Sequence, residues 1–386
     1  MTTRIGVIGS GYISKGLIEA LLRCDDLAPS RVLTRSDVRG RDDYPQPGLL
    51  TNDLAAVLRE SDVIVECSGD VAHATEVVDA ALHEGLPVVT MDAEMQVTTG
   101  SYFVGRGLLT EAEGDQPGCL AASAAEAREM GFCPLVYGNI KGFLHHRPAR
   151  KDMEYWGTRQ GISMTRVVSF TDGTKLQLEQ ALVANGLGAT IAQDGLIGPE
   201  VLKVGDAVER LGSAAEAAGR PIADYVLSPA SPPGVFIVAT HSAAQKLYLA
   251  NFKLGDGPHY LLLRNYHLCH LEIPRTLRRV VRGGGALLDN SKVPEVSVAA
   301  VAKRTLEPGD ELAHGIGSFD VRGEAVRFRE NVSHCPIGLL QHATVVRRIE
   351  DGQMLSMNDV ALPDSLALRA WMAIRERVVS AQLEGS

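Results

Sequence analysis

The stretch Ile5-Gly-Val-Ile-Gly9-Ser-Gly11-Tyr-Ile-Ser14 decides the predicted fold of the N-terminal part of the chain. A short apolar strand leads into a glycine-rich turn, and apolar residues at helical spacing follow, which is the context that a dinucleotide-binding fingerprint requires. Gly9 permits the tight turn, and Gly11 lets the backbone approach a pyrophosphate at the N-terminus of the helix. Ser14 replaces the third glycine of the motif and is small enough to keep the helix close to the strand.

Strands and helices alternate along the first 138 residues. Such alternation predicts a doubly wound parallel sheet covered on both faces, which is the α/β architecture of a Rossmann domain. We therefore expect a dinucleotide-binding domain over residues 1–138. The predicted strands are 5–8, 31–34, 63–67, 86–90 and 132–137, and the predicted helices are 12–24, 54–59, 75–83, 102–110 and 121–131.

The end of the second predicted strand favours NADP over NAD. Enzymes that prefer NAD usually end this strand with a carboxylate that binds the ribose 2′-hydroxyl. Here the strand ends in Thr34-Arg35-Ser36, and a guanidinium flanked by two hydroxyls suits a 2′-phosphate. Asp37 lies just beyond and leaves NAD open, and Arg35 could instead be a solvated loop residue.

The predicted cofactor site combines the two motifs with a third turn. Ser68 and Gly69 follow a buried strand, at whose carboxyl end the nicotinamide and the substrate should meet. The residues predicted to bind the cofactor are Gly9, Ser10, Gly11, Tyr12, Ile13, Arg35, Ser36, Ser68 and Gly69.

The regular alternation of strands and helices ends after residue 138. A helix at 174–185 and β-type segments at 235–239 and 260–264 predict an α+β substrate and dimerisation domain over residues 139–295. The polar stretch 147–161 predicts an exposed excursion or lid. Short β-type segments then predict a small β-rich module over residues 296–386, closed by a helix at 365–379.

Composition excludes several classes of partner. The net charge of −9, with no dense tract of lysine or arginine, argues against nucleic acid or an anionic membrane. The six cysteines are scattered without a CxxC pair, which predicts free thiols in a reducing compartment. No signal peptide or apolar run of membrane-spanning length is evident, so a cytoplasmic protein is expected.

Several segments carry a resemblance to known oxidoreductases. Val63–Gly69 and Val88–Glu94 resemble the nucleotide domain of homoserine dehydrogenases. Four later segments resemble homoserine-dehydrogenase-like oxidoreductases that carry a C-terminal SAF domain, a group that includes deoxyxylulose-phosphate reductoisomerase-like enzymes. These segments are Glu113-Gly-Asp115-Gln-Pro-Gly118, Ser169-Phe-Thr-Asp172-Gly-Thr-Lys175, Gly255-Asp-Gly-Pro258-His-Tyr260 and Tyr266-His267-Leu-Cys-His-Leu-Glu272-Ile-Pro274.

The C-terminal residues extend this resemblance, and two substitutions limit it. The stretches 302–310 and 351–360 look like the SAF module. Ala93 stands where homoserine dehydrogenases carry a lysine, and the segment Gly138-Asn-Ile-Lys141-Gly142 replaces their substrate-binding segment. Because of these two differences, we do not expect homoserine to be the substrate.

Four residues are predicted to act in catalysis, namely Lys141, Lys175, Asp115 and Glu94. A lysine beside the nicotinamide can hydrogen-bond a developing alkoxide and transfer a proton. Lys141 follows an apolar strand, and Lys175 opens a helix behind Asp172, a predicted N-cap. Asp115 and Glu94 each follow a break in the sheet rhythm and could orient a lysine or bind substrate hydroxyls.

Each candidate also has a structural alternative. Lys175 and Glu179 have the i,i+4 spacing of a surface ion pair, and the two acids could be solvated loop residues. His267, His270 and Glu272 form the only suggestive His/Glu group, on a predicted β-type segment, where a structural or interface role is favoured. A reductoisomerase could use a divalent metal, but no ligand cluster has metal spacing, so no metal site is predicted.

These observations predict an NADPH-dependent oxidoreductase that reduces or oxidises a small polyol, sugar phosphate or hydroxy-acid-like substrate, with or without isomerisation. One alternative is an activity like that of 1-deoxy-D-xylulose 5-phosphate reductoisomerase. The other is a non-catalytic scaffold that binds NADP. The expected partners are a small-molecule substrate and further copies of the chain, in a homodimer or higher homo-oligomer.

Overall fold

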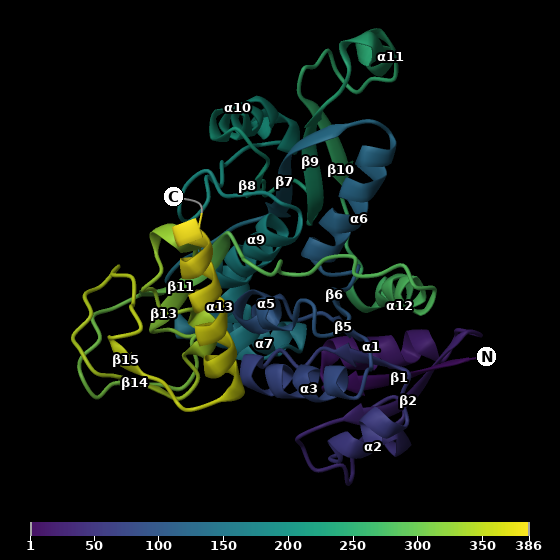
Figure 1. Ribbon diagram of the computed structural model, residues 1–386, viewed down its shortest axis with the longest axis vertical. Coiled ribbons are helices and arrows are strands. Elements are labelled where there is room, and N and C mark those ends of the chain that lie inside the picture. The colour runs from purple at the N-terminus through teal and green to yellow at the C-terminus, as the bar shows by residue number, and fades with distance from the viewer. Residues whose placement is uncertain (1, 385–386) are drawn as a thin grey trace.

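The computed structural model describes residues 2–384, and its N-terminal part is a six-stranded parallel sheet (Figure 1). The strand order is β3-β2-β1-β4-β5-β6, which is the doubly wound arrangement predicted from the sequence. The strands are β1 (Thr3–Ile8), β2 (Leu27–Leu33), β3 (Leu50–Thr51), β4 (Val63–Glu66), β5 (Val88–Thr90) and β6 (Leu109–Glu111).

Helices cover both faces of this sheet. The first three are α1 (Tyr12–Leu21), α2 (Leu54–Arg59) and α3 (Val71–His83). One face packs against α1 together with α12 (Ile273–Val281), whose Ile273, Leu277 and Val280 join the same apolar core. The opposite face packs against α3. Helix α12 belongs to the predicted 139–295 domain by its sequence position, but it packs on the sheet of the nucleotide domain.

A second, mixed sheet has the order β10-β9-β7-β8. Its strands are β7 (Cys133–Lys141), β8 (Ile222–Leu227), β9 (Gly234–Thr240) and β10 (Tyr260–Arg264). One face packs on α6 (Gln116–Glu129) and α9 (Thr174–Gly186), and the other on α10 (Val208–Ala218). The strand predicted at 132–137 was wrongly placed in the nucleotide domain. It is the start of β7, so the predicted boundary at 138 falls inside one strand.

The C-terminal residues form a β-rich module closed by a long helix. Its elements are β11 (Val296–Ala302), β12 (Glu311–Leu312), β13 (Val321–Arg327), β14 (Ala343–Val345), β15 (Val360–Ala361) and α13 (Leu366–Glu384). β11 pairs with β13, and both pack on α9, so one core continues from the second sheet into this module. Figure 1 shows α13, in yellow, lying beside α3 and α5 of the nucleotide domain.

Two local predictions were wrong. The helix predicted at 102–110 is absent, because the residues before it form α4 (Ala93–Met95), a π-turn (Gln96–Gly100) and α5 (Ser101–Phe103), and Gly105 then turns the chain with φ +87° into β6. The segment predicted as β-type around His267 forms a 3₁₀ turn, Cys269–Leu271, that leads into α12, where Pro274 lies in the first turn.

The predicted excursion at 147–161 is mostly helical. It forms α7 (Arg150–Gln160), which is followed by α8 (Met164–Thr171), and a short α11 (Lys246–Asn251) lies between β9 and β10. The other 3₁₀ turns are Pro47–Leu49, Val204–Ala207, Ala243–Gln245, Phe328–Glu330 and Ile337–Leu339.

All six cysteines are free thiols. Within residues 2–384, no helix combines the length and apolar character needed to cross a membrane.

The C-terminal module contains a buried histidine that predicts a pH-dependent stability. His334 lies against Phe328 and Trp371, which stack on each other, and its Nε2 is 2.8 Å from Ser297 Oγ. Burial lowers the pKa of His334 from 6.5 to about 4. The unfolded chain therefore binds a proton below pH 6.5 that the folded chain excludes until about pH 4.

Neutral His334 contributes its full stability above pH 6.5. As the pH falls from 6.5 to 4, we expect the free energy of unfolding to decrease by up to about 3 kcal/mol. Urea denaturation across this range should show a shallower pH dependence in His334→Asn, whose side chain does not titrate. Equal pH slopes in the two proteins would contradict the assignment.

Candidate active site

The glycine-rich turn between β1 and α1 fits a bound dinucleotide. Gly9 has φ +98°, and a Cβ at this position would lie 3.0 Å from Ser68 Cα. A Cβ on Gly11, by contrast, would meet nothing within 4 Å, so the backbone faces open space. Gly11 is the N-cap of α1, and no side chain caps that helix. The N–H groups of the first turn are therefore free to bind phosphate.

A cleft of about 410 Å³ runs over this turn. Eight of the nine residues predicted to bind the cofactor line it, namely Gly9, Ser10, Gly11, Tyr12, Ile13, Arg35, Ser36 and Ser68. The ninth, Gly69, lines a neighbouring cavity that also contains Ser68 and Arg35. The structure thus brings the predicted cofactor residues to one continuous surface.

The end of β2 opens a separate hollow of about 590 Å³, lined by Arg35, Ser36 and Asn52 among others. Arg35 is largely exposed and its Nη1 lies 2.7 Å from Asp70 Oδ2. Asp37 is paired with Arg39 at 2.7 Å, and these hydrogen bonds lower the pKa of Asp37. Arg35 and Asp37 both line the hollow, and each already has an ion-pair partner.

A buried carboxylate shapes the turn at the end of β4. Glu66 accepts hydrogen bonds from the Ser68 backbone N–H at 2.8 Å and from its hydroxyl at 2.6 Å, and its second oxygen accepts one from Thr90 Oγ1 at 3.0 Å. Burial raises the pKa of Glu66. These contacts fix the Ser68–Gly69 turn, where the sheet edge meets the cofactor cleft.

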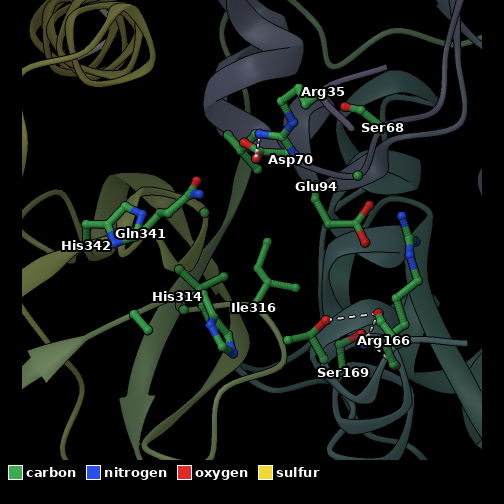
Figure 2. Close-up of a pocket in the computed structure, with 18 residues that line it drawn as sticks. Arg35, Ser68, Asp70, Glu94, Arg166, Ser169, His314, Ile316, Gln341 and His342 are labelled. Carbon is green, nitrogen blue, oxygen red and sulfur yellow. Dashed lines mark hydrogen bonds and ion pairs between the residues drawn. The ribbon is translucent and has the colours of Figure 1, made fainter. Parts of the chain in front are cut away.

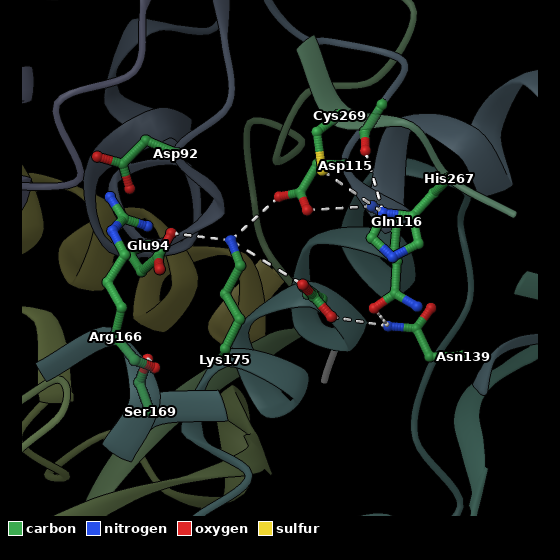
Figure 3. Close-up of polar contacts among 12 residues, drawn as sticks. Asp92, Glu94, Asp115, Gln116, Asn139, Arg166, Ser169, Lys175, His267 and Cys269 are labelled. Atoms are coloured by element: carbon green, nitrogen blue, oxygen red, sulfur yellow. Dashed lines mark hydrogen bonds and ion pairs between the residues drawn. The ribbon is translucent and has the colours of Figure 1, made fainter. Parts of the chain in front are cut away.

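The centre of the site is a buried lysine (Figure 3). Lys175 Nζ lies 3.1 Å from Glu94 Oε2 and 3.0 Å from Asp115 Oδ2, with Glu179 Oε1 at 4.0 Å. Burial alone would lower the pKa of Lys175, but Asp115 and Glu94 hold it well above its ordinary value. Burial likewise opposes ionisation of Glu94, yet the charges of Lys175 and Arg166 lower the pKa of Glu94 to about 2. Lys175 is thus a charged ammonium within a group of carboxylates.

Lys141 joins the same group from the second sheet. Its Nζ lies 2.5 Å from Gln116 Oε1 and 3.2 Å from Glu179 Oε2. Asn139 Nδ2 donates to the same Glu179 oxygen at 2.8 Å. Burial raises the pKa of Glu179. One carboxyl group therefore lies between the two lysines, and Lys141 is the more exposed of the two.

The four predicted catalytic residues come together from four separate elements. Glu94 lies on α4, Asp115 precedes α6, Lys141 ends β7 and Lys175 begins α9. The alternative of Lys175–Glu179 as a surface pair is wrong, because both side chains are buried. Likewise, neither acid is solvated, since Glu94 and Asp115 are both buried.

Sequence reasoning missed the polar residues around these four, namely Glu66, Asp92, Glu111, Gln116, Asn139 and Arg166. Asn139 could have been found, because it shares one face of its strand with Lys141. The buried acids gave no such signal. Burial raises the pKa of Asp92 and of Glu111 well above the ordinary value, so both favour the uncharged form.

The predicted N-cap of α9 has a different role. The N-cap is Gly173, and Asp172 precedes it, accepting a hydrogen bond from Thr174 N at 2.9 Å. The other oxygen of Asp172 lies 2.6 Å from Lys303 Nζ, in a pair with almost no exposed surface. Helix α9 carries Lys175, and this ion pair attaches the start of that helix to the C-terminal module.

The histidines near 267 are structural neighbours of the site. His267 Nδ1 lies 3.3 Å from the carbonyl oxygen of Gly114. A Cβ on Gly16 would lie 2.5 Å from the His270 ring, which also meets Tyr12 edge-on. These contacts hold the Cys269–Leu271 turn against α1. Within residues 2–384, no group of three or more His, Cys, Asp or Glu side chains is arranged to hold a metal ion.

Comparison with known families identifies the two main parts of the chain. The NAD-binding domain of homoserine dehydrogenase matches residues 9–102, and the catalytic domain of oxidoreductase DRL matches residues 114–273. The resemblance of the N-terminal domain to homoserine dehydrogenases is therefore confirmed. Neither match extends beyond residue 273, so the C-terminal module lies outside both. The chain is an oxidoreductase with a nicotinamide-nucleotide-binding domain.

Solved structures show a more distant similarity. UDP-N-acetylglucosamine 3-dehydrogenase from Acidithiobacillus ferrooxidans is 13% identical, with a TM-score of 0.43 over 75% of this chain and 92% of its own. A myo-inositol dehydrogenase from Corynebacterium glutamicum is 11% identical, with a TM-score of 0.41 over 74% of this chain and 90% of its own. An oxidoreductase from Thermotoga maritima is 13% identical, with a TM-score of 0.41 over 76% and 92%. A search of curated proteins found no match.

The Asp172–Lys303 pair gives a direct test of how the site is supported. Asp172→Asn leaves a buried ammonium without its counter-ion, and we expect a loss of about 3–5 kcal/mol in the free energy of unfolding. The double variant Asp172→Asn with Lys303→Met removes both charges and should lose less than the sum of the single changes. Urea denaturation measures all three, and strictly additive losses would contradict the pairing.

Proposed function

We propose that this protein catalyses the NADP-dependent interconversion of an alcohol and a carbonyl group on a small polyol, sugar phosphate or hydroxy acid. The observation that carries the proposal is the Lys175 ammonium, held by Glu94 and Asp115 at the edge of the nucleotide-binding sheet. Glu94 lines the same cavity as Ser68 and Gly69, the turn at which the nicotinamide is expected. A bound nicotinamide supplies or accepts the hydride.

Lys175 supplies the proton in the direction of reduction. Its Nζ is charged, so it can hydrogen-bond a carbonyl oxygen and donate its proton as negative charge develops there. The flanking carboxylates of Glu94 and Asp115 fix the ammonium in place, and burial excludes competing water. In the direction of alcohol oxidation, the same nitrogen must first lose its proton.

Glu179 and Lys141 provide the route for that proton. Glu179 lies between Lys175 and Lys141, at 4.0 Å and 3.2 Å, and burial raises its pKa so that it accepts a proton more readily than an ordinary carboxylate. Lys141 is partly exposed and connects this carboxyl to solvent. Lys175, Glu179 and Lys141 thus form a path from the reacting oxygen to the surface.

A second candidate is reductoisomerisation of a ketose phosphate, as in deoxyxylulose-phosphate reductoisomerase-like enzymes. It is favoured because three of the segments that resemble this group meet at one cluster. Asp115 pairs with Lys175, and His267 Nδ1 lies 3.3 Å from the carbonyl oxygen of Gly114. Assignment of the C-terminal module as an SAF domain belongs to the same proposal.

A homodimer or higher homo-oligomer is also part of the proposal. Large apolar side chains are exposed at Leu247 and Tyr248 on α11 and at Phe252 just after it. Leu263 is likewise exposed on the edge strand β10. Exposed apolar side chains near an unpaired strand edge are typical of a contact between subunits.

The catalytic assignment is tested by absorbance of the nicotinamide across a panel of ketose phosphates, aldonates and amino-acid-derived alcohols. On any substrate that turns over, we expect Lys175→Met to lower kcat by about 10²–10⁴-fold, because the proton donor is lost. Lys175→Arg retains the charge but gives up its proton far less readily, so it should fold and show a similar loss. Lys141→Met should slow turnover less.

The control is Lys292→Met at an exposed position before β11, which should leave turnover and cofactor affinity unchanged. Cofactor affinity should also survive in the Lys175 variants. Full turnover in Lys175→Met would overturn the assignment. A product with a rearranged carbon skeleton would select the reductoisomerase candidate.

Coenzyme choice is tested at Arg35. We expect Arg35→Ala to weaken NADP binding by about 10–100-fold through loss of a charge-assisted contact to the 2′-phosphate, while NAD binding changes little. Fluorescence titration measures both affinities. Arg59→Ala, an exposed arginine on α2, is the matched control. An equal loss for both coenzymes would contradict a role in reading the 2′-phosphate.

A further inference from the structure

A cavity of about 350 Å³ lies where three parts of the chain meet (Figure 2). The nucleotide domain contributes Ser68 and Glu94, helix α8 contributes Arg166 and Ser169, and loops of the C-terminal module contribute the remaining wall. The wall residues from that module are Ala313, His314, Gly315, Ile316, Ile337, Gly338, Gln341 and His342. Neither family match covers this module, so its presence at the cavity is a property of the structure alone.

The charges of the cavity are unevenly paired. Glu94 is bound to Lys175 at 3.1 Å, and Asp70 is bound to Arg35 at 2.7 Å. Within residues 2–384, no ion pair or side-chain hydrogen bond engages the Arg166 guanidinium. Figure 2 shows this side chain on the wall facing the loop of His314. Its charge helps to lower the pKa of Glu94, but Glu94 is itself bound to Lys175. The N–H donors of this half-buried guanidinium are therefore left for an anion.

The position of Arg166 places this anion beside the reacting centre. A Cβ on Gly69 would lie 1.9 Å from Arg166 Nη2, so the guanidinium packs directly on the Ser68–Gly69 turn. Arg166 also lines the cofactor cleft. An anionic group held here is therefore close to the turn at which the nicotinamide is expected and to Glu94, which contacts Lys175.

The opposite wall is supported by packing of the C-terminal module on α7 and α8. A Cβ on Gly317 would lie 2.1 Å from the carbonyl oxygen of Thr165, and the Arg150 guanidinium lies 4.4 Å from the centre of the Phe319 ring. The Lys303–Asp172 pair adds a buried link nearby. His314, on the loop between these contacts and β12, therefore faces the cavity from a fixed support.

We propose that the C-terminal module completes the substrate site, with Arg166 binding an oxyanion of the substrate, a carboxylate or a phosphate, and His314 contacting it from the opposite wall. The proposal rests on the proposed function, because it assigns the second half of the same site. It makes Arg166 and His314 specificity-determining residues, distinct from the lysines that move the proton.

The test measures anion binding without turnover. Protein saturated with NADP, so that the cofactor's own phosphate sites are filled, is titrated separately with inorganic phosphate and with acetate by calorimetry. We expect saturable binding of at least one anion. Arg166→Met should weaken it by about tenfold or more, the effect of losing one charge-assisted contact. Tighter binding of phosphate or of acetate identifies which oxyanion the site prefers.

Further variants separate the two walls. Arg166→Lys keeps the charge without the planar fork and should bind with intermediate affinity. His314→Asn should weaken binding several-fold, whereas Arg347→Met, an exposed arginine of the same module, should not change it. On an anionic substrate that turns over, Arg166→Met should raise KM far more than it lowers kcat.

Two results would overturn the inference: no saturable binding of either anion, or the same affinity in the wild-type protein and Arg166→Met. An unchanged affinity in His314→Asn would remove the C-terminal module from the site. Because these titrations need no reaction, they can fail while the Lys175 variants still lose turnover. In that case the proposed function stands and only the oxyanion site is withdrawn.

Discussion

The architecture of the site depends on one buried cation. Lys175 is surrounded by Glu94 and Asp115, which are distant from it in the sequence, and by Glu179 on its own helix. A buried ammonium is tolerated only when carboxylates compensate for its lost hydration, and those carboxylates in turn need the lysine. The nucleotide domain and the second sheet are therefore held in one arrangement, and the same charges that stabilise it can move a proton.

Helix α9 connects this cluster to the rest of the protein. It is buried on all sides, so each polar side chain needs a partner. Lys175 and Glu179 face the site, whereas Thr174 and Gln177 accept hydrogen bonds from the backbone N–H groups of Gly323 and Ala325 on β13, both under 3 Å. The helix thus carries catalytic candidates on one side and the C-terminal module on the other, which couples the position of the module to that of Lys175.

Much of this could be predicted from the sequence, because local signals specify local structure. The turn at Gly9 and the alternation of strands and helices predicted the parallel sheet correctly. The sequence also singled out Lys141 and Lys175, but it left open a surface ion pair of Lys175 with Glu179. The return of α12 to the first sheet could not be predicted, since its apolar face has the same spacing whichever sheet it covers. The pairing of Asp172 with Lys303 was equally hidden, because a buried ion pair between distant residues leaves no periodic pattern.

The central claim is that the Lys175 ammonium meets the reacting oxygen beside the nicotinamide. A crystal structure of the protein with NADP bound tests this most directly. The account predicts the nicotinamide ring against the Ser68–Gly69 turn, with its C4 atom facing a space that Lys175 Nζ reaches within hydrogen-bonding distance of a substrate oxygen, about 3 Å. A ring that points away from this cluster, or one that is separated from Lys175 by packed apolar side chains, would contradict it.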